Sequence, residues 1–230
     1  MTRKNVERRA LTEKLGVEID PELLSLALTH RSFAYENGGI PHNERLEFLG
    51  DSVLGQAVTV RLFTRHPDLD EGSLAKRRAS VVSTVALAEV ARTIGLGEHI
   101  RLGRGEILTG GRDKDSILAD TMEALIGATF LSAGPDAATA MVLRLVEPLL
   151  ADPERYGAAM DPKTSLQEIA ARLGLAAPVY AVEATGPDHD RRFTATVTTG
   201  DVVTTGAGSS KKHAEMAAAL TAWRELDARA

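Results

Sequence analysis

Two different hydrophobic periods in one chain restrict the folds that it can adopt. From residue 2 to about residue 150, apolar side chains recur at the three- and four-residue spacings of amphipathic helices. Beyond that point a helical segment is followed by three alternating runs, at 163–173, 179–184, 193–198 and 202–205. Alternation at period two, with the turn Gly200-Asp201 between the last two runs, is typical of an antiparallel hairpin. The pattern therefore predicts a mainly α chain, with an all-helical domain followed by a small α-β-β-β-α domain whose helices cover one face of a three-stranded sheet.

The domain boundaries follow from composition. A polar stretch with two prolines and Gly157 predicts a linker at 152–160, between a first domain at 1–151 and a second at 161–230. In the first domain, Asp20 and Pro21 predict a cap and a first helical position, and Gly72-Ser73 predicts the start of another helix. The expected helices span 3–15, 21–29, 43–65, 73–94, 114–131 and 136–150, with a glycine-rich loop at 103–111, and the chain ends in a helix at 210–226.

The composition of the chain excludes some kinds of metal site, but it does not identify a binding partner. The chain has no cysteine, so disulfides and thiolate metal sites are excluded, and any metal must be held by oxygen or histidine. The formal net charge is −5, and neither half is basic, since residues 161–230 hold 8 Lys and Arg against 9 Asp and Glu. Only local clusters can therefore indicate a nucleic-acid partner. We find no apolar run of membrane-spanning length and no secretory signal, so we expect a cytoplasmic protein with no membrane partner.

A column of acidic residues marks the helix expected at 43–65. Glu44, Glu47 and Asp51 are spaced three and four apart, so they lie on one face beside an apolar stripe. Like charges at these spacings weaken an isolated helix by roughly 0.2–0.5 kcal/mol per pair. A bound cation would remove that cost, which makes the column a candidate metal site.

A second acidic pair, Asp120 and Glu123, lies three apart on the helix expected at 114–131. Its neighbours are apolar or small, which predicts a helix packed closely on several sides. Two such helices could direct four carboxylates to one centre, and carboxylates with water are the ligands that Mg²⁺ prefers. The pattern alone leaves two interpretations equally open, a ligand set or two solvated helix faces. Glu71 could be a further carboxylate of such a site, although a favourable charge at a helix start explains it more simply.

In the second domain, residues 206–214 place glycines, a capping serine and two lysines at a helix start. Exposed backbone N–H groups and the positive end of the helix dipole suit a phosphate, and Lys211 and Lys212 could reach its neighbours. An ordinary capped helix with surface lysines is the alternative. The short polar side chains of 163–168 and 186–189 suit ribose hydroxyls and favour the nucleic-acid interpretation, while the few aromatic residues disfavour a single-strand binder.

Taken together, these motifs resemble those of bacterial ribonuclease III. Residues 43–54, Asn-Glu-Arg-Leu-Glu-Phe-Leu-Gly-Asp-Ser-Val-Leu, look like the signature of that family, and the blocks at 28–32, 70–72 and 116–127 fit it in order. Residues 161–228 resemble the double-stranded-RNA-binding domain. The resemblance implies an endoribonuclease that hydrolyses double-stranded RNA with Mg²⁺, or Mn²⁺ as a substitute, and with no organic cofactor. It further implies a homodimer that leaves 5′-phosphates, 3′-hydroxyls and short 3′ overhangs, and that processes ribosomal RNA precursors and structured messenger RNAs.

The resemblance also assigns roles to single residues. It makes four carboxylates the catalytic and metal-binding set, namely Glu47, Asp51, Asp120 and Glu123, and gives Glu44 and Glu71 a secondary acidic role. Phe48 matches an aromatic residue that contacts the partner subunit. The RNA contacts that it implies are Thr164, Gln167 and Glu168 on one minor groove, His189 on the next, and Ser210, Lys211 and Lys212 on the phosphates between them.

Two other classes of protein compete with this interpretation. A catalytically silent, dimeric double-stranded-RNA-binding protein would be expected to have lost carboxylates, whereas this chain keeps all four. A helical phosphohydrolase acting on small nucleotides would account for the acidic pairs, but it leaves residues 161–230 without a role.

Overall fold

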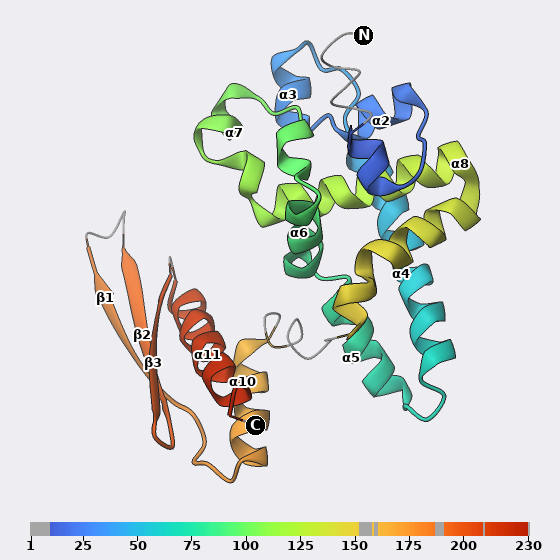
Figure 1. The fold of residues 1–230 in the computed structure, drawn as a ribbon. Helices are drawn as coiled ribbons and strands as arrows, with labels where there is room; N and C mark the ends of the chain where they lie inside the picture. Colours follow the sequence, from blue (N-terminus) through green and yellow to red (C-terminus); the bar gives the residue numbers. More distant parts are fainter. Residues whose placement is uncertain (1–9, 152–157, 159–160, 187–190, 209, 230) are drawn as a thin grey trace. The chain divides into compact units, whose positions relative to one another are not determined.

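A computed structural model describes residues 10–151, 158, 161–186, 191–208 and 210–229. The chain divides into two compact units, Met1–Pro153 and Glu154–Ala230. The first unit is helical and the second combines helices with one sheet (Figure 1). This confirms the predicted fold class.

The first unit is built around two helices, α4 (Glu44–Arg65) and α8 (Asp115–Ala151), which make the most extensive contact in the chain. Residues 10–15 are helical as well. The remaining elements are α2 (Pro21–Ala27), α3 (Arg31–Glu36), α5 (Glu71–Val81), α6 (Thr84–Thr93), the 3₁₀ turns η1 (Leu96–His99) and η2 (Gly111–Asp113), and α7 (Arg104–Leu108). The part of the predicted helix 3–15 that precedes residue 10 lies outside the described residues.

Local capping explains where most of these helices begin. As predicted, Asp20 caps α2 by accepting from the backbone N–H of Glu22 at 2.9 Å, and Pro21 takes the first helical position. The prediction for 73–94 is wrong in two ways. The helix begins earlier, because Asp70 accepts from the N–H of Ser73 at 2.7 Å, and it breaks at Ser83, whose hydroxyl accepts from the N–H of Ala86 at 3.2 Å and so starts α6.

Two further expectations need correction, namely a loop at 103–111 and the absence of any apolar segment long enough to cross a membrane. The predicted loop 103–111 contains the short helix α7. The helix α8, which has a kink at Gly134 (φ 87°) between the two predicted helices, is long and apolar enough by composition to cross a membrane. However, 61% of its most apolar window is buried within the protein, as expected for a core helix.

The second unit has the predicted order, α10 (Pro162–Arg172), β1 (Val179–Thr185), β2 (Arg192–Thr199), β3 (Val202–Gly208) and α11 (Lys211–Asp227). The strands form an antiparallel sheet in the order β1-β2-β3. Thr199 pairs with Val202 across the predicted Gly200-Asp201 turn, where Gly200 has φ 56°.

Helix α11 packs on the sheet through its smallest side chains. Ala214, Ala218 and Ala222 are fully buried against strands β2 and β3 and helix α10. Gly206 and Gly208 of β3 face the same helix, and a Cβ on Gly206 would lie 2.1 Å from the backbone nitrogen of Ala218. These glycines therefore allow the helix to pack closely on the sheet. The sequence pattern had assigned the same glycines to a phosphate-binding helix start.

Candidate active site and RNA-binding surface

The acidic helices approach each other where each has a glycine. A Cβ on Gly50 of α4 would lie 1.8 Å from the carbonyl oxygen of Glu123, and one on Gly127 of α8 would lie 2.2 Å from that of Leu46. Any other residue at these positions would push the two backbones apart. The contact thus places Glu47 and Glu123, each about one turn before a glycine, at the junction of the helices.

Three carboxylates meet at this junction. Glu47 of α4 and Asp120 and Glu123 of α8 each offer one oxygen, and these oxygens lie within 4.8 Å of one another. All three side chains are half-buried. Oxygen atoms at this separation are a donor set suited to a hard divalent cation.

The electrostatics of the group show how unfavourable the three charges are together. Burial, followed by the charges of Asp51, Asp120 and Glu47, raises the pKa of Glu123 to about 8. Burial also raises the pKa of Glu47, with Asp120 as its next largest cause. The pKa of Asp120 is raised by burial too, and Arg31 partly opposes this. In the absence of a cation, Glu123 therefore holds a proton near neutral pH.

The other acidic residues of the sequence prediction lie at different distances from this centre. Asp51 is exposed and outside the group of three, although its charge acts on Glu123. Glu44 lies at the start of α4 and its charge acts on Glu47 and Asp120. Glu71 is exposed in the first turn of α5 and lines neither the group of three nor the cavity described next.

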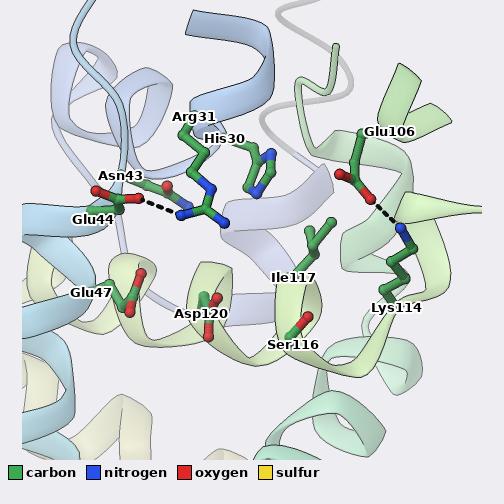
Figure 2. Close-up of a pocket in the computed structure, with 10 residues that line it drawn as sticks. All are labelled: His30, Arg31, Asn43, Glu44, Glu47, Glu106, Lys114, Ser116, Ile117 and Asp120. Atoms are coloured by element: carbon green, nitrogen blue, oxygen red, sulfur yellow. Dashed lines mark hydrogen bonds and ion pairs between the residues drawn. The ribbon is translucent and has the colours of Figure 1, made fainter. Parts of the chain in front are cut away.

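A cavity of about 540 Å³ opens beside the carboxylates (Figure 2). Glu44 and Glu47 approach it from α4, and Asp120 lies along its floor on α8. Its lining is completed by His30, Arg31, Asn43, Glu106, Lys114, Ser116 and Ile117. Figure 2 shows Arg31 and His30 pointing toward the cavity from the start of α3, with Arg31 beside Glu44.

Sequence reasoning missed the basic and polar residues of this lining, because they come from segments that lie far apart in the chain. Arg31 Nη1 lies 3.4 Å from Glu44 Oε1. Lys114 forms an ion pair with Glu106 and donates to Thr109 Oγ1 at 2.8 Å. The His30 ring accepts from the N–H of Ser32 at 3.2 Å and so caps α3. The sequence signals for this part of the lining were the family blocks at 28–32, 43–54 and 116–127, from which no role was assigned to His30, Arg31, Asn43 or Ser116.

Asn43, which also lines the cavity, is a buried polar residue. It is 2% exposed, and its backbone N–H donates to the carbonyl of Thr29 at 3.0 Å. Its side-chain Nδ2 has no hydrogen-bond partner within the part of the chain that the structure describes. A buried donor left unpaired costs about 1–3 kcal/mol. An acceptor on a water molecule or on a ligand would remove this cost.

Phe48, the predicted dimer contact, is exposed on this unit. It follows Glu47 on α4 and is 80% exposed, and Phe63 on the same helix is 72% exposed. Large aromatic side chains this exposed are typical of interaction surfaces.

In the second unit, the predicted RNA contacts of α10 are Thr164, Gln167 and Glu168. All three are exposed, and their spacing of three and four places them on one helix face. The opposite face packs in the core through Leu166 and Ile169.

The predicted phosphate contacts lie at the start of α11. Ser210 caps the helix by accepting from the N–H of His213 at 3.2 Å, and Lys211 and Lys212 are exposed in the first turn. A helix start with two lysines in its first turn is a favourable position for an anion. His189 lies outside the described residues.

Comparison with known proteins assigns a family to each of the two units. Residues 20–149 match the family described as Ribonuclease-III-like, and residues 162–226 match the double-stranded RNA binding motif. Ribonuclease 3 of Leifsonia xyli subsp. xyli is 71% identical over 98% of this chain and 96% of its own length. Ribonuclease 3 of Thermobifida fusca is 58% identical over 96% of this chain and 93% of its own.

A solved structure of the nuclease domain of ribonuclease III from Campylobacter jejuni covers 60% of this chain and 95% of its own, with 41% identity and a TM-score of 0.57. Its description refers to structural flexibility in a region involved in dimer formation. The fold and these comparisons define the class of the protein, an enzyme with a helical nuclease unit and a double-stranded-RNA-binding unit. The chain belongs to the ribonuclease III family and is a ribonuclease III-type endoribonuclease.

Proposed function

We propose that this enzyme hydrolyses phosphodiester bonds of double-stranded RNA with Mg²⁺ held by Glu47, Asp51, Asp120 and Glu123. The observation that carries the proposal is the convergence of three half-buried carboxylates from two helices beside an open cavity. Their raised pKa values reflect a centre whose charge a divalent cation would balance. Mn²⁺ prefers the same ligands and would substitute.

The donor set fits such a cation. Glu47, Asp120 and Glu123 would be direct ligands, and Asp51, one turn beyond Glu47 on α4, would complete the set from the exposed side. When bound, the cation would supply the Lewis acidity that phosphodiester hydrolysis needs. Glu44 and Glu71 take the secondary acidic role that the family pattern gives them.

The chain's own residues then perform binding and orientation. In the second unit, Thr164, Gln167 and Glu168 would contact one minor groove and His189 the next, while Ser210, Lys211 and Lys212 hold the phosphates between them. Recognition of this kind depends on the shape of A-form RNA and is largely independent of sequence. The nuclease unit would receive the scissile strand in the cavity beside Asp120.

We further propose a homodimer in which Phe48 contacts the partner subunit. The exposure of Phe48 supports this, as does the dimer-forming nuclease domain from Campylobacter jejuni. Two centres acting on opposite strands would leave 5′-phosphates, 3′-hydroxyls and short 3′ overhangs. The substrates we propose are ribosomal RNA precursors and structured messenger RNAs in the cytoplasm.

The test is incubation of the full-length protein with a long perfect RNA duplex, with and without Mg²⁺, followed by sizing and end-group analysis of the products. We expect conversion to short duplexes only with the cation, and 5′-phosphates that a phosphatase removes. Glu123→Gln is the matched variant, because it keeps the side-chain shape and removes the charge. Cleavage that persists with excess chelator, or in Glu123→Gln at the wild-type rate, would contradict the proposal.

A further inference from the structure

The cavity beside the carboxylates has both acidic and basic side chains in its lining. The acidic ones are Glu44, Glu47, Asp120 and Glu106. The basic ones are Arg31, which lies beside Glu44, and Lys114, which pairs with Glu106 on the other side of the cavity (Figure 2). A cation accounts for the carboxylates at the helix junction, whereas the positive side chains suit a second anionic group of the substrate. In an RNA strand, that group is a phosphate next to the one being cleaved.

The two positive side chains differ in how firmly they are held. Lys114 is engaged by Glu106 and by Thr109 at 2.8 Å, which ties α7 to the start of α8. The Arg31 side chain is 61% exposed and lies 3.4 Å from Glu44. By comparison, Arg65 at the other end of α4 lies 2.7 Å from Glu147. Arg31 is therefore the cation that can exchange its partner at little cost.

Arg31 also affects the ionisation of the proposed catalytic carboxylates. Its charge lowers the pKa of both Glu47 and Asp120, opposing the effect of their burial. Arg31 therefore lies near enough to these carboxylates to act on them electrostatically, and it lines the same cavity as both.

Asn43 supplies an independent observation at the same place. It lines the same cavity, it is 2% exposed, and its Nδ2 has no partner in the described parts of the chain. In Figure 2 it lies behind the pair formed by Arg31 and Glu44.

From this geometry we propose that Arg31 and Asn43 form a positioning subsite for a phosphate adjacent to the scissile one in the cleaved RNA strand. Arg31 contacts a non-bridging oxygen through its guanidinium, and the Asn43 amide donates to the same phosphate or to its ribose. Neither residue takes part in bond breaking. The inference rests on the proposed active site, because that site fixes which phosphate is cleaved.

The experiment combines a protein change with a chemical change in the RNA. Arg31→Ala, Arg31→Lys and the control Arg65→Ala are compared in single-turnover cleavage of a duplex with one cleavage site. The duplex is prepared with normal linkages, or with a neutral methylphosphonate at the linkage on either side of that site. We expect Arg31→Ala to slow cleavage of the normal duplex by roughly tenfold, Arg31→Lys less, and Arg65→Ala not at all.

The diagnostic result is non-additivity. If Arg31 contacts one of the two neighbouring phosphates, the loss caused by Arg31→Ala should disappear once that phosphate is neutral. Equal losses on all three duplexes, or no loss on any, would overturn the inference. If the wild type fails to cleave in Mg²⁺, the proposed function itself is wrong.

A binding measurement tests the subsite without catalysis. With Ca²⁺ in place of Mg²⁺, Arg31→Ala should reduce the slope of log K against log salt by about 0.9 for each subunit of the proposed homodimer, the amount for one lost phosphate contact per subunit. Asn43→Ala should weaken binding by several-fold without changing that slope, since it removes no charge. Thermal melts verify that each variant is folded. An unchanged slope in a folded Arg31→Ala variant would contradict the proposed contact.

Discussion

The carboxyl group of Glu123 should make the metal-free enzyme less stable as the pH rises, and Glu123→Gln should remove this effect. Burial and the neighbouring carboxylates raise its pKa in the folded protein to about 8, from an ordinary value of 4.5. The folded state therefore holds this proton more tightly than the unfolded state does. The resulting stabilisation is complete below pH 4.5 and is lost as the pH rises through about 8.

The size of the effect follows from the difference between the two pKa values. Taken in full, it corresponds to about 5 kcal/mol, because each unit of pKa is worth about 1.4 kcal/mol. The side chain is only partly buried, so solvent screening reduces this to about 2 kcal/mol. In a domain of this size, that is a difference of roughly 4–8 °C in melting temperature.

The assay is differential scanning calorimetry of the full chain in chelator, from pH 5 to pH 9. The wild type and Glu123→Gln should melt close together at pH 5, and the variant should become the more stable protein toward pH 9. Added Mg²⁺ should reverse this order, because the cation stabilises the protein that binds it. Glu98→Gln, a change of an exposed glutamate in η1, serves as the control for loss of a carboxyl group.

Two results would refute the reasoning. Parallel pH profiles for the wild type and Glu123→Gln would show that Glu123 is not buried among like charges. Equal stabilisation of both proteins by Mg²⁺ would show that Glu123 is not a ligand. In either case the variant's RNA binding, measured in Ca²⁺, should stay near the wild-type value, since the second unit is unchanged.

Three further predictions concern the helix contact, the dimer and the RNA-binding surface. Gly127→Ala should destabilise the first unit by roughly 1–3 kcal/mol and slow cleavage, because its Cβ would lie 2.2 Å from the carbonyl oxygen of Leu46; an unchanged melting temperature would contradict the close contact. Phe48→Ala should shift the sedimentation equilibrium toward monomer without lowering the melting temperature of a separated monomer, since the ring is exposed; a dimer of unchanged affinity would rule Phe48 out as a contact. The double change Lys211→Ala and Lys212→Ala should reduce the slope of log K for RNA against log salt by about 2 for each subunit bound to the RNA, and an unaltered slope would disprove the phosphate contacts.

Much of the architecture could be predicted from local chemistry. The change from helical to alternating period predicted both the helical unit and the three-stranded sheet, and the Gly200-Asp201 turn fixed the register of its hairpin. Where a prediction was wrong, a short-range competition decided the outcome. The side chain of Ser83 captures a backbone N–H and so divides one expected helix into two, which periodicity alone does not reveal.

The candidate site divides along the same line. The acidic residues could be named from their spacing of three and four, because that spacing fixes which face of one helix they share. Their convergence depends on the approach of α4 and α8 at Gly50 and Gly127, which is a property of two backbones brought together. The sequence treats Asp51 and Glu47 alike, whereas the structure places Glu47 in the group of three and leaves Asp51 exposed beside it.

The sequence by itself determined the class of fold and the family, and it predicted the carboxylates of the candidate site, since these depend on spacing within single helices and on motifs of contiguous residues. Only the tertiary structure decided which basic residues share a cavity with the carboxylates. Arg31 and Lys114 come from distant segments and have no periodic relation to the acidic residues, so only the folded chain brings them to one cavity. The unpaired amide of Asn43 is likewise a consequence of burial, which a residue's neighbours in space determine and its neighbours in sequence do not.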